Sequence, residues 1–336
     1  MSEPVIIAVD AMGGEGSPNK VIDGIHYSIK KSKDNFFHLY GNKNILLELI
    51  DKKKIKKYCN IIDTTDFISD DESPLTAAKK GKNTSMGSAI HAVKDKKADI
   101  ILSAGNTGAL LILSRMILNM LSGVEKPALA GLWPNKKGIN VVLDLGANIE
   151  CKYNNLIDFS NMGSALFKSL FPDEKAFVAL LNVASEEGKG NENLKKAYNL
   201  LKESFNNNYD FFGYIEGNHI MDGSANVIVT DGFTGNVALK TAEGTANFII
   251  KSLKKSLTKT FINKLSMILS RNSLKEFQSK LDPRKYNGAI LLGLQGPVVK
   301  SHGATDYYGF AHSIEMCNKI IRGKLIDKIK LNLLKK

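Results

Sequence analysis

The chain has 336 residues, of which 43% are hydrophobic, and a formal net charge of +12. This length suits one large unit over residues 1–336 or two coupled lobes, and no apolar run approaches the ~20 residues that cross a bilayer. Cys59, Cys151 and Cys317 show no zinc spacing, so packing thiols in a reduced cytosolic setting are expected.

Short apolar runs ending in turns of Gly, Asn and Asp recur along the chain. We expect strands at 6–9, 100–102, 141–143, 178–183, 211–215 and 227–229, because continuous β-branched runs are typical of strands buried on both faces of a parallel sheet. Helical patterns begin at Pro18 and cover 44–57, 85–96, 107–121, 154–170 and 191–204. This alternation predicts a doubly wound, mostly parallel sheet in an α/β/α sandwich.

Ligands of such sheets bind beyond the carboxyl ends of the strands. We therefore expect the six turns that follow these strands to share one polar edge, where backbone N–H groups hold an anion such as phosphate. The net positive charge fits an anionic partner or only a lysine-rich composition. No basic motif with interleaved aromatic residues occurs, so nucleic acid is not an expected partner.

Residues 244–285 interrupt the alternation. Apolar residues recur there at about every fourth position, and lysines and arginines occupy the other face. This predicts a projecting basic amphipathic helix or helical hairpin. Its apolar stripe fits either a subunit interface or docking on an anionic membrane. The expected contacts with membrane or acyl chain are Leu257, Phe261, Leu265 and Ile268. A strand at 288–293, a helix at 304–321 and a solvated lysine-rich tail after Arg322 follow.

The run from Ser103 to Ala109 is the best candidate for anion binding. Ser103, Gly105 and Gly108 are small enough for the backbone to approach an oxyanion, and the helix that follows adds a partial positive charge at its N-terminus. Asn106 and Thr107 can donate further hydrogen bonds. A tight turn with a helix cap explains part of this run, but not all of it.

Other turns offer charged and polar groups. Lys189 lies between two glycines, Asp231 precedes the start of the long helix, and His302 follows a strand in a turn of small residues. Lys189 and His302 are candidates for charge stabilisation or acid–base work. The remaining expected substrate contacts are Asp10, Gly13, Gly14, Asn148, Asn191, Thr234, Gly235 and Asn236. No metal site is expected, although a divalent ion is left open.

The ordered set of turns closely resembles the bacterial phosphate acyltransferases of phospholipid synthesis, the PlsX type. The matching stretches are Val9–Gly14, Ser103–Ala109, Asp144–Asn148, Gly188–Glu192, Thr230–Asn236 and Ala289–His302. The resemblance runs from residue 5 to about residue 320. Glu15 stands where the family usually has Asp, which keeps the charge.

The resemblance implies that acyl-[acyl carrier protein] and inorganic phosphate give acyl phosphate and free carrier protein. It also implies a fold similar to the isocitrate dehydrogenase and phosphotransacetylase group, a homodimer, and a cytoplasmic enzyme peripherally bound to the membrane. A membrane glycerol-3-phosphate acyltransferase would use the product. No catalytic Ser or Cys is required, because phosphate is its own nucleophile, and no cofactor is expected.

This reading assigns hypothetical roles to the candidate residues. Asn106 and Thr107 would hold phosphate, Lys189 and His302 would stabilise charge, and Asp231 would orient one of these groups. Three rivals remain open: a phosphotransacylase that uses acyl-coenzyme A, a nicotinamide-dependent dehydrogenase and a non-catalytic membrane scaffold. The dehydrogenase would need clustered arginines, and Arg115, Arg271, Arg284 and Arg322 are widely spread.

Overall fold

The computed structural model describes residues 3–204, 207–260, 263, 270–280 and 282–334. Its strands are β1 (Val5–Asp10), β2 (Asn35–Gly41), β3 (Cys59–Asp63), β4 (Ile100–Ser103), β5 (Ala128–Pro134), β6 (Ile139–Leu143), β7 (Phe177–Leu181), β8 (Asp210–Ile215), β9 (Val227–Val229), β10 (Ala289–Leu292) and β11 (Val298–Lys300). They form one 11-stranded sheet in the order β3-β2-β1-β4-β11-β10-β5-β6-β9-β7-β8.

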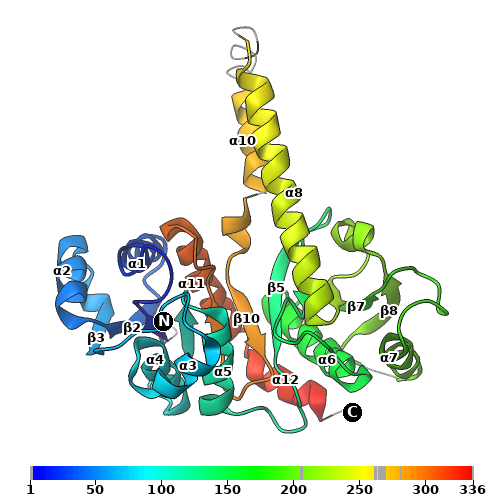
Figure 1. Cartoon of the computed structure of the whole chain (residues 1–336), viewed down its shortest axis with the longest axis horizontal. Coiled ribbons are helices and arrows are strands. Elements are labelled where there is room, and N and C mark those ends of the chain that lie inside the picture. The colour runs from blue at the N-terminus through cyan, green and yellow to red at the C-terminus, as the bar shows by residue number, and fades with distance from the viewer. Residues whose placement is uncertain (1–2, 205–206, 261–262, 264–269, 281, 335–336) are drawn as a thin grey trace.

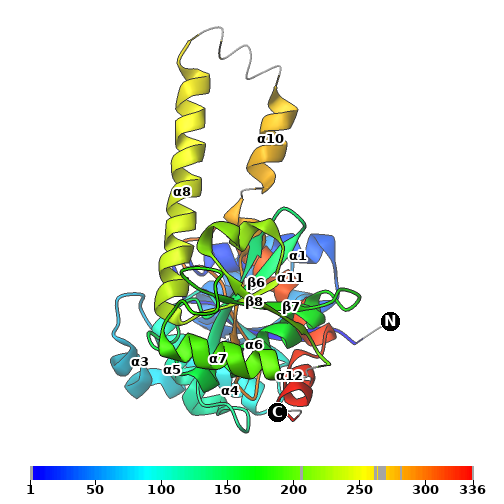
Figure 2. The ribbon, with the colours of Figure 1, turned by 90° about the vertical axis from the view of Figure 1, so that its right-hand side faces the viewer.

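Helices cover both faces of this sheet (Figures 1 and 2). One face packs against α1 (Asn19–Lys31), α2 (Lys43–Lys53), α6 (Tyr153–Leu170), α7 (Glu192–Glu203), α11 (Tyr307–Arg322) and α12 (Leu325–Leu333). The other face packs against α3 (Pro74–Lys80), α4 (Ser85–Lys94), α5 (Thr107–Leu118) and part of α8 (Gly232–Thr258). The predicted α/β/α sandwich is confirmed.

The apolar runs became buried strands for the expected reason. In β1, Ile7 and Val9 face one core while Ala8 faces the other, and all three are fully buried. The strand therefore has no solvent face that would require a polar residue. Its neighbours β2 and β4 are parallel to it, as the connecting helices require.

The strand direction reverses in the middle of the sheet. Strand β11 is parallel to β4, but the pairs β11–β10, β10–β5 and β5–β6 are antiparallel. Strands β6, β9, β7 and β8 therefore run opposite to β1 and β4. The prediction that all six turns share one edge of the sheet is wrong, because the antiparallel pairs at the centre place them at two opposite ends of the strand ladder.

The tail after Arg322 is also not solvated as predicted. Helix α12 buries Leu325 and Ile329, and the Asn332 side chain donates to the Asn161 carbonyl at 3.0 Å on α6. The lysines of this tail lie on one side of an amphipathic helix, so the charge-rich composition concealed an apolar face.

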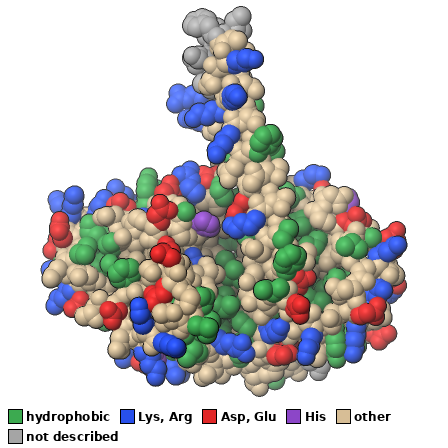
Figure 3. Space-filling view, in the orientation of Figure 1, with side chains coloured by type: hydrophobic (Ala, Val, Ile, Leu, Met, Phe, Trp, Pro, Cys, Tyr) green, Lys and Arg blue, Asp and Glu red, His purple; other side chains and the backbone are tan. Residues whose placement is uncertain are grey.

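A helical projection rises from the body (Figures 1 and 2). It consists of α8 and the returning helix α10 (Arg271–Lys280). Among the residues of α8, only Gly232 and Gly235 in its first turn are buried. Figure 3 shows basic side chains gathered along this projection. Within the described residues, no helix is long and apolar enough to cross a membrane.

Candidate active site

Asp10 links the turns that follow β1 and β4. Its carboxylate is buried and accepts hydrogen bonds from Ser85 Oγ at 2.6 Å and Ser103 Oγ at 2.7 Å. Ser103 Oγ in turn accepts the N–H of Gly105 at 3.1 Å. Burial raises the pKa of Asp10, and these hydrogen bonds oppose the rise. Asp10 therefore positions the two turns rather than offering itself to a ligand.

The glycines of the first turn allow this close approach. A Cβ atom on Gly13 would lie 2.5 Å from the Asp10 carboxylate and 2.8 Å from the Gly105 Cα atom. Gly14 has a φ of +85°, and its Cβ atom would lie 2.5 Å from the Ala104 carbonyl oxygen. Any side chain at either position would separate the two turns.

Two buried lysines border the same turns, and the sequence reasoning missed both. Lys300 ends β11, and its ammonium donates to the carbonyls of Ser301 and, at 3.3 Å, Ala104. Lys20 lies in the first turn of α1, and its ammonium donates to the Gly303 carbonyl. Each lysine is only 7% exposed. The available signal was a lysine that ends an apolar strand directly before the turn of His302.

Both lysines have a perturbed pKa. Burial lowers the pKa of Lys300 to about 8 and also lowers the pKa of Lys20. Asp70 is the opposite charge with the largest effect on both. Neither ammonium belongs to any ion pair found among the described residues.

His302 borders this cluster in the turn that follows β11. Its backbone N–H donates to Asn287 Oδ1 at 2.9 Å, and its Nδ1 atom accepts the Ala304 N–H at 3.2 Å. Burial lowers the pKa of His302, and the charge on Lys300 lowers it further. The ring is therefore neutral near pH 7, with its proton inferred on Nε2. His302 can donate a hydrogen bond but does not supply the positive charge expected from the sequence.

Asn106 has a structural position. Its Oδ1 atom caps α5 by accepting the Ala109 N–H at 3.0 Å, and its amide donates to the carbonyls of Asp70 and Glu72, both at 2.9 Å. These bonds engage both ends of the side chain, contrary to the predicted phosphate contact. Thr107 is exposed in the first turn of α5, while Gly108 lies under Pro74.

The turn after β6 fixes the start of α8. The Asp144 carboxylate accepts the Ala147 N–H at 2.9 Å and both the N–H and the side-chain amide of Asn148 at 2.8 Å. The Asn148 carbonyl accepts the Gly232 N–H at 2.7 Å, and a Cβ atom on Gly235 would overlap the Asp144 carbonyl oxygen. Asn148 and Gly235, both predicted substrate contacts, therefore hold α8 in place.

Asp231 has other partners than those predicted. Its carboxylate accepts the Thr234 N–H at 2.8 Å and the Thr234 hydroxyl at 2.9 Å, which makes it the cap of α8. Asn236 is exposed on the second turn of this helix. Lys240 and Glu243, further along α8, influence the pKa of His302. They lie about 12–17 Å along the helix axis from Gly232, and no hydrogen bond joins Asp231 to His302 among the described residues.

Lys189 is exposed in the loop that follows β7. Its carbonyl accepts from the Asn182 amide at 3.1 Å, and nearby Asn191 caps α7 through the Leu194 N–H at 2.9 Å. This loop leaves the end of the strand ladder opposite to the turns of β1 and β4. The structure therefore brings Asp10, Gly13, Gly14, Ser103, Gly105 and His302 together, and it does not bring Lys189, Asp231 or Asn191 into contact with them.

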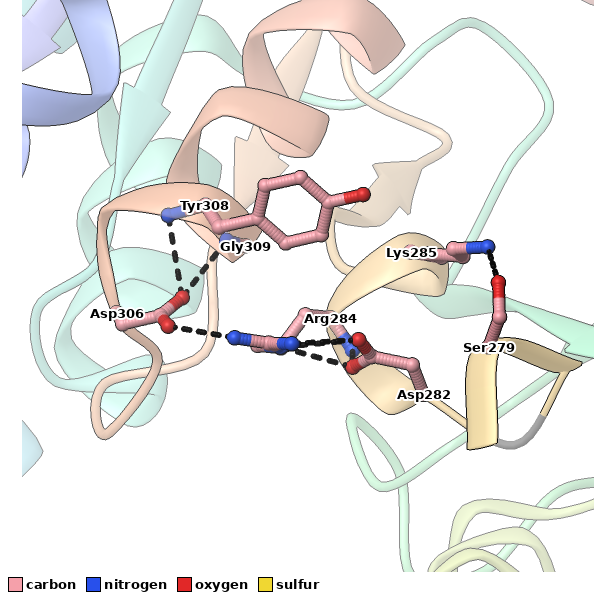
Figure 4. Close-up of polar contacts among 7 residues, drawn as sticks. All are labelled: Ser279, Asp282, Arg284, Lys285, Asp306, Tyr308 and Gly309. Atoms are coloured by element: carbon pink, nitrogen blue, oxygen red, sulfur yellow. Dashed lines mark hydrogen bonds and ion pairs between the residues drawn. The ribbon is translucent and has the colours of Figure 1, made fainter. Parts of the chain in front are cut away.

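Arg284 ties the base of the projection to Asp306 at the start of α11 (Figure 4). Arg284 Nη1 donates to Asp306 at 2.8 Å while its Nε and Nη2 atoms grip Asp282 at 2.9 and 2.7 Å. Asp306 caps α11 through the Tyr308 and Gly309 N–H groups. Because Asn287 also bonds Ser301 and His302, the return of the chain from α10 holds the turn that borders the lysines.

The predicted apolar contacts of the projection are described only in part. Leu257 faces Leu274 and Phe277 across a shallow groove between α8 and α10. Phe261, Leu265 and Ile268 lie outside the described residues. Over the described part of the chain, no group of three or more His, Cys, Asp or Glu side chains could hold a metal ion.

Comparison with solved structures places this geometry in a known fold. A phosphotransacetylase from Staphylococcus aureus is 16% identical with a TM-score of 0.59, covering 96% of this chain and 94% of that one. A branched-chain phosphotransacylase from Enterococcus faecalis V583 is 14% identical with a TM-score of 0.59, covering 94% and 99%. Identities this low show a shared fold, and the predicted likeness to the phosphotransacetylase group is confirmed.

Comparison of sequences defines the family. The family described as fatty acid synthesis protein matches residues 5–328. A phosphate acyltransferase from Pelagibacter ubique is 55% identical, covering 99% of this chain and all of the relative. One from Paramagnetospirillum magneticum is 38% identical, covering 98% and 94%. The chain therefore belongs to the phosphate acyltransferase family of fatty acid and phospholipid synthesis, and it is an acyltransferase.

Proposed function

We propose that this enzyme transfers the acyl group of an acyl-[acyl carrier protein] to inorganic phosphate. The observation that carries the proposal is the junction of the turns after β1, β4 and β11, which Asp10 and Ser103 lock together. This junction combines glycine-lined backbone, the N-terminus of α5 and the His302 ring in one place. Backbone N–H groups and a helix N-terminus favour an oxyanion.

The reaction needs no protein nucleophile. An oxygen of hydrogen phosphate attacks the thioester carbonyl carbon, and the C–S bond breaks as the tetrahedral intermediate collapses. The products are the acyl phosphate dianion and the carrier thiol, whose sulfur takes up the proton originally on hydrogen phosphate. The enzyme holds phosphate in line with the thioester and stabilises the developing oxyanion. In this proposal the Nε2–H group of His302 donates to that oxyanion, and Thr107 contributes to phosphate binding.

Carrier protein is the proposed acyl donor because of charge. The net charge of this chain is +12, and acyl carrier proteins are acidic as a class, so electrostatic attraction would speed their encounter. Basic side chains line the projection above the junction, at Lys251, Lys254, Lys255, Arg271, Lys275 and Lys280.

We also propose that the projection is covered in the working enzyme. Phe248 is 70% exposed on α8, and Ile249 and Val237 are exposed as well. A helix with so little buried surface gains stability from a partner.

A second copy of the chain would cover the apolar stripe in a homodimer, and the basic side chains of the projection would contact an anionic membrane. Acyl phosphate would then pass to a membrane glycerol-3-phosphate acyltransferase.

The proposed reaction is tested by thiol release from a purified long-chain acyl-[acyl carrier protein], with and without inorganic phosphate. Strictly phosphate-dependent release, with acyl phosphate trapped by hydroxylamine, is the expected result. The matched measurement uses acyl-coenzyme A of the same chain length. Turnover of that donor alone would assign a phosphotransacylase instead, and inactivity on both donors would contradict the proposed reaction.

A further inference from the structure

We infer that Lys20 and Lys300 together bind the phosphate substrate. Their two ammonium groups lie near the backbone at Gly14, Ala104 and Gly303. This inference rests on the proposed function and assigns its phosphate site to particular side chains. Neither lysine lies in a motif from which the sequence predicted phosphate binding. Both come from elements that meet only in the fold, α1 and the end of β11.

The first argument is the cost of the charges. A buried ammonium group has lost its hydration, which destabilises the folded protein unless an opposite charge compensates it. Here two ammonium groups are buried, the charge on Lys20 lowers the pKa of Lys300, and neither ammonium has an ion-pair partner among the described residues. The carboxylates of Asp70, Glu15 and Asp10 favour the charged lysines only from beyond ion-pair distance. An incoming dianion would supply the missing charge.

The second argument is convergence. A Cβ atom on Gly14 would lie 3.0 Å from Lys20 Nζ and 2.5 Å from the Ala104 carbonyl oxygen. Lys300 Nζ holds that same carbonyl oxygen at 3.3 Å. A Cβ atom on Gly303 would lie 3.4 Å from it as well. Both ammonium groups therefore lie close to the same carbonyl oxygen, where Gly14 and Gly303 place no side chain between them.

The third argument is hydrogen-bonding capacity. An ammonium group has three donors. The contacts of Lys20 occupy one donor, to Gly303, and those of Lys300 occupy two, to Ala104 and Ser301. These carbonyl contacts fix the two nitrogen atoms in position but do not neutralise them. The remaining N–H donors of the two ammonium groups can bind the acceptor oxygens of phosphate. Hydrogen bonds between charged groups are stronger than those between neutral groups.

The oxyanion could come from inorganic phosphate or from the phosphodiester of the carrier's prosthetic group. The two sources share the same chemistry, so the experiment must separate them. Initial rates are measured against inorganic phosphate at saturating acyl-[acyl carrier protein], and against the acyl donor at saturating phosphate. Phosphate binding to the free enzyme is measured in parallel by calorimetry, which does not depend on turnover.

The variants are Lys300→Met and Lys20→Met, with Lys94→Met as the control, because Lys94 is an exposed lysine at the end of α4. Removing one charge-assisted contact is expected to raise the KM for inorganic phosphate about ten- to hundredfold. The KM for the acyl donor stays unchanged, and calorimetric phosphate binding weakens by the same factor. Lys94→Met behaves as the wild type. If Lys300→Met does not fold, Lys20→Met carries the same test.

An unchanged KM for phosphate in both variants, with normal turnover, would overturn the lysine site and leave the proposed reaction intact. An increase confined to the KM of the acyl donor would also overturn it, since the lysines would then hold the prosthetic group. Lysine-dependent phosphate binding in an enzyme that turns over no acyl donor would support the anion site and contradict the proposed reaction.

Discussion

The turns after β1 and β6 look alike in sequence and serve different purposes in the fold. Asp10 and Asp144 both end a buried strand, both are buried, and burial raises the pKa of each. Asp144 accepts the N–H groups of its own turn and that of Leu129 on β5, and thereby positions α8. Asp10 accepts N–H groups of its own turn, but it also joins that turn to Ser85 and Ser103, and its charge acts on Lys300, one of the two buried lysines of the described residues. The two turns therefore differ in their surroundings: the turn of Asp144 supports the start of a helix, whereas the turn of Asp10 lies near lysines that only the fold brings there.

The largest expected effects come from the glycines that permit each arrangement. Gly235→Ala places a Cβ atom on the Asp144 carbonyl, and Gly13→Ala places one against Gly105, so each should lower the free energy of unfolding by about 1–3 kcal/mol or more. Gly244→Ala is the control, since nothing lies within 4 Å of its Cβ position. As a mid-helix replacement it should stabilise the protein by roughly 0.5–1 kcal/mol. Urea denaturation measures the free energy of unfolding of all three variants. Equal free energies would contradict the packing described for Gly13 and Gly235.

The second prediction asks which half of the molecule carries the chemistry. His302→Ala removes a hydrogen-bond donor at the junction and is expected to lower kcat about a hundredfold or more. Lys189→Ala changes an exposed loop at the other end of the strand ladder, and turnover should hardly change. Steady-state kinetics on acyl-[acyl carrier protein] give both values. A large loss in Lys189→Ala with a normal His302→Ala would move the active site to the second set of turns.

The third prediction uses the lowered pKa of Lys300. Burial holds this pKa at about 8 instead of its ordinary 10.5, so the ammonium loses its proton as the pH rises through 8. The KM for phosphate should therefore rise above pH 8, by about tenfold per pH unit. Over the same range the unfolded chain binds more protons than the folded one, so stability without phosphate should increase towards pH 10.5.

The reference for this pH dependence is Lys300→Met, which lacks the titrating group. Thermal unfolding and phosphate kinetics are compared between the variant and the wild type from pH 7 to pH 10. The difference in stability should shrink as the pH rises, and the difference in phosphate KM should shrink with it. Parallel curves for the two proteins would show that Lys300 does not titrate in this window.

The smallest effect concerns the link between the projection and the junction. Arg284→Lys keeps the charge but cannot grip Asp282 with two nitrogen atoms while reaching Asp306. We expect a loss of about 1 kcal/mol in stability, because these side chains are partly exposed, and a severalfold loss of kcat through the His302 turn. Lys285→Arg, one residue further on, is the neighbouring control. An effect on stability alone would remove the link to catalysis.

The continuous apolar runs at β1, β4, β6 and β7 made most of the sheet predictable, because burial on both faces excludes polar residues. Asp10, Gly13 and Gly14 were predictable for a similar reason, since a tight turn after a buried strand restricts its residues locally. Strands β2, β3 and β5 were missed, and with β5 the reversal of direction at β10, β5 and β6. The direction in which two strands pair depends on residues far apart in the chain, so no local sequence pattern indicates it.

The lysines show the same limit in the site itself. Lys20 and Lys300 read as ordinary surface residues in a chain with many lysines, and only the packing of α1 against the end of β11 buries them. Asn106 and Asp231 were chosen for their polar side chains, and both turned out to cap helices. Residue type and spacing thus indicated the turns correctly, while the use of each side chain depended on neighbours distant in sequence.

The most direct test of this account is a crystal structure of the enzyme with phosphate, at a resolution that shows the ion and its ligands. We predict phosphate beside Gly14, within hydrogen-bond distance of Lys20 and Lys300. Phosphate bound instead at Asn148 and the start of α8, with the two lysines untouched, would contradict the assignment of the anion site to the first set of turns.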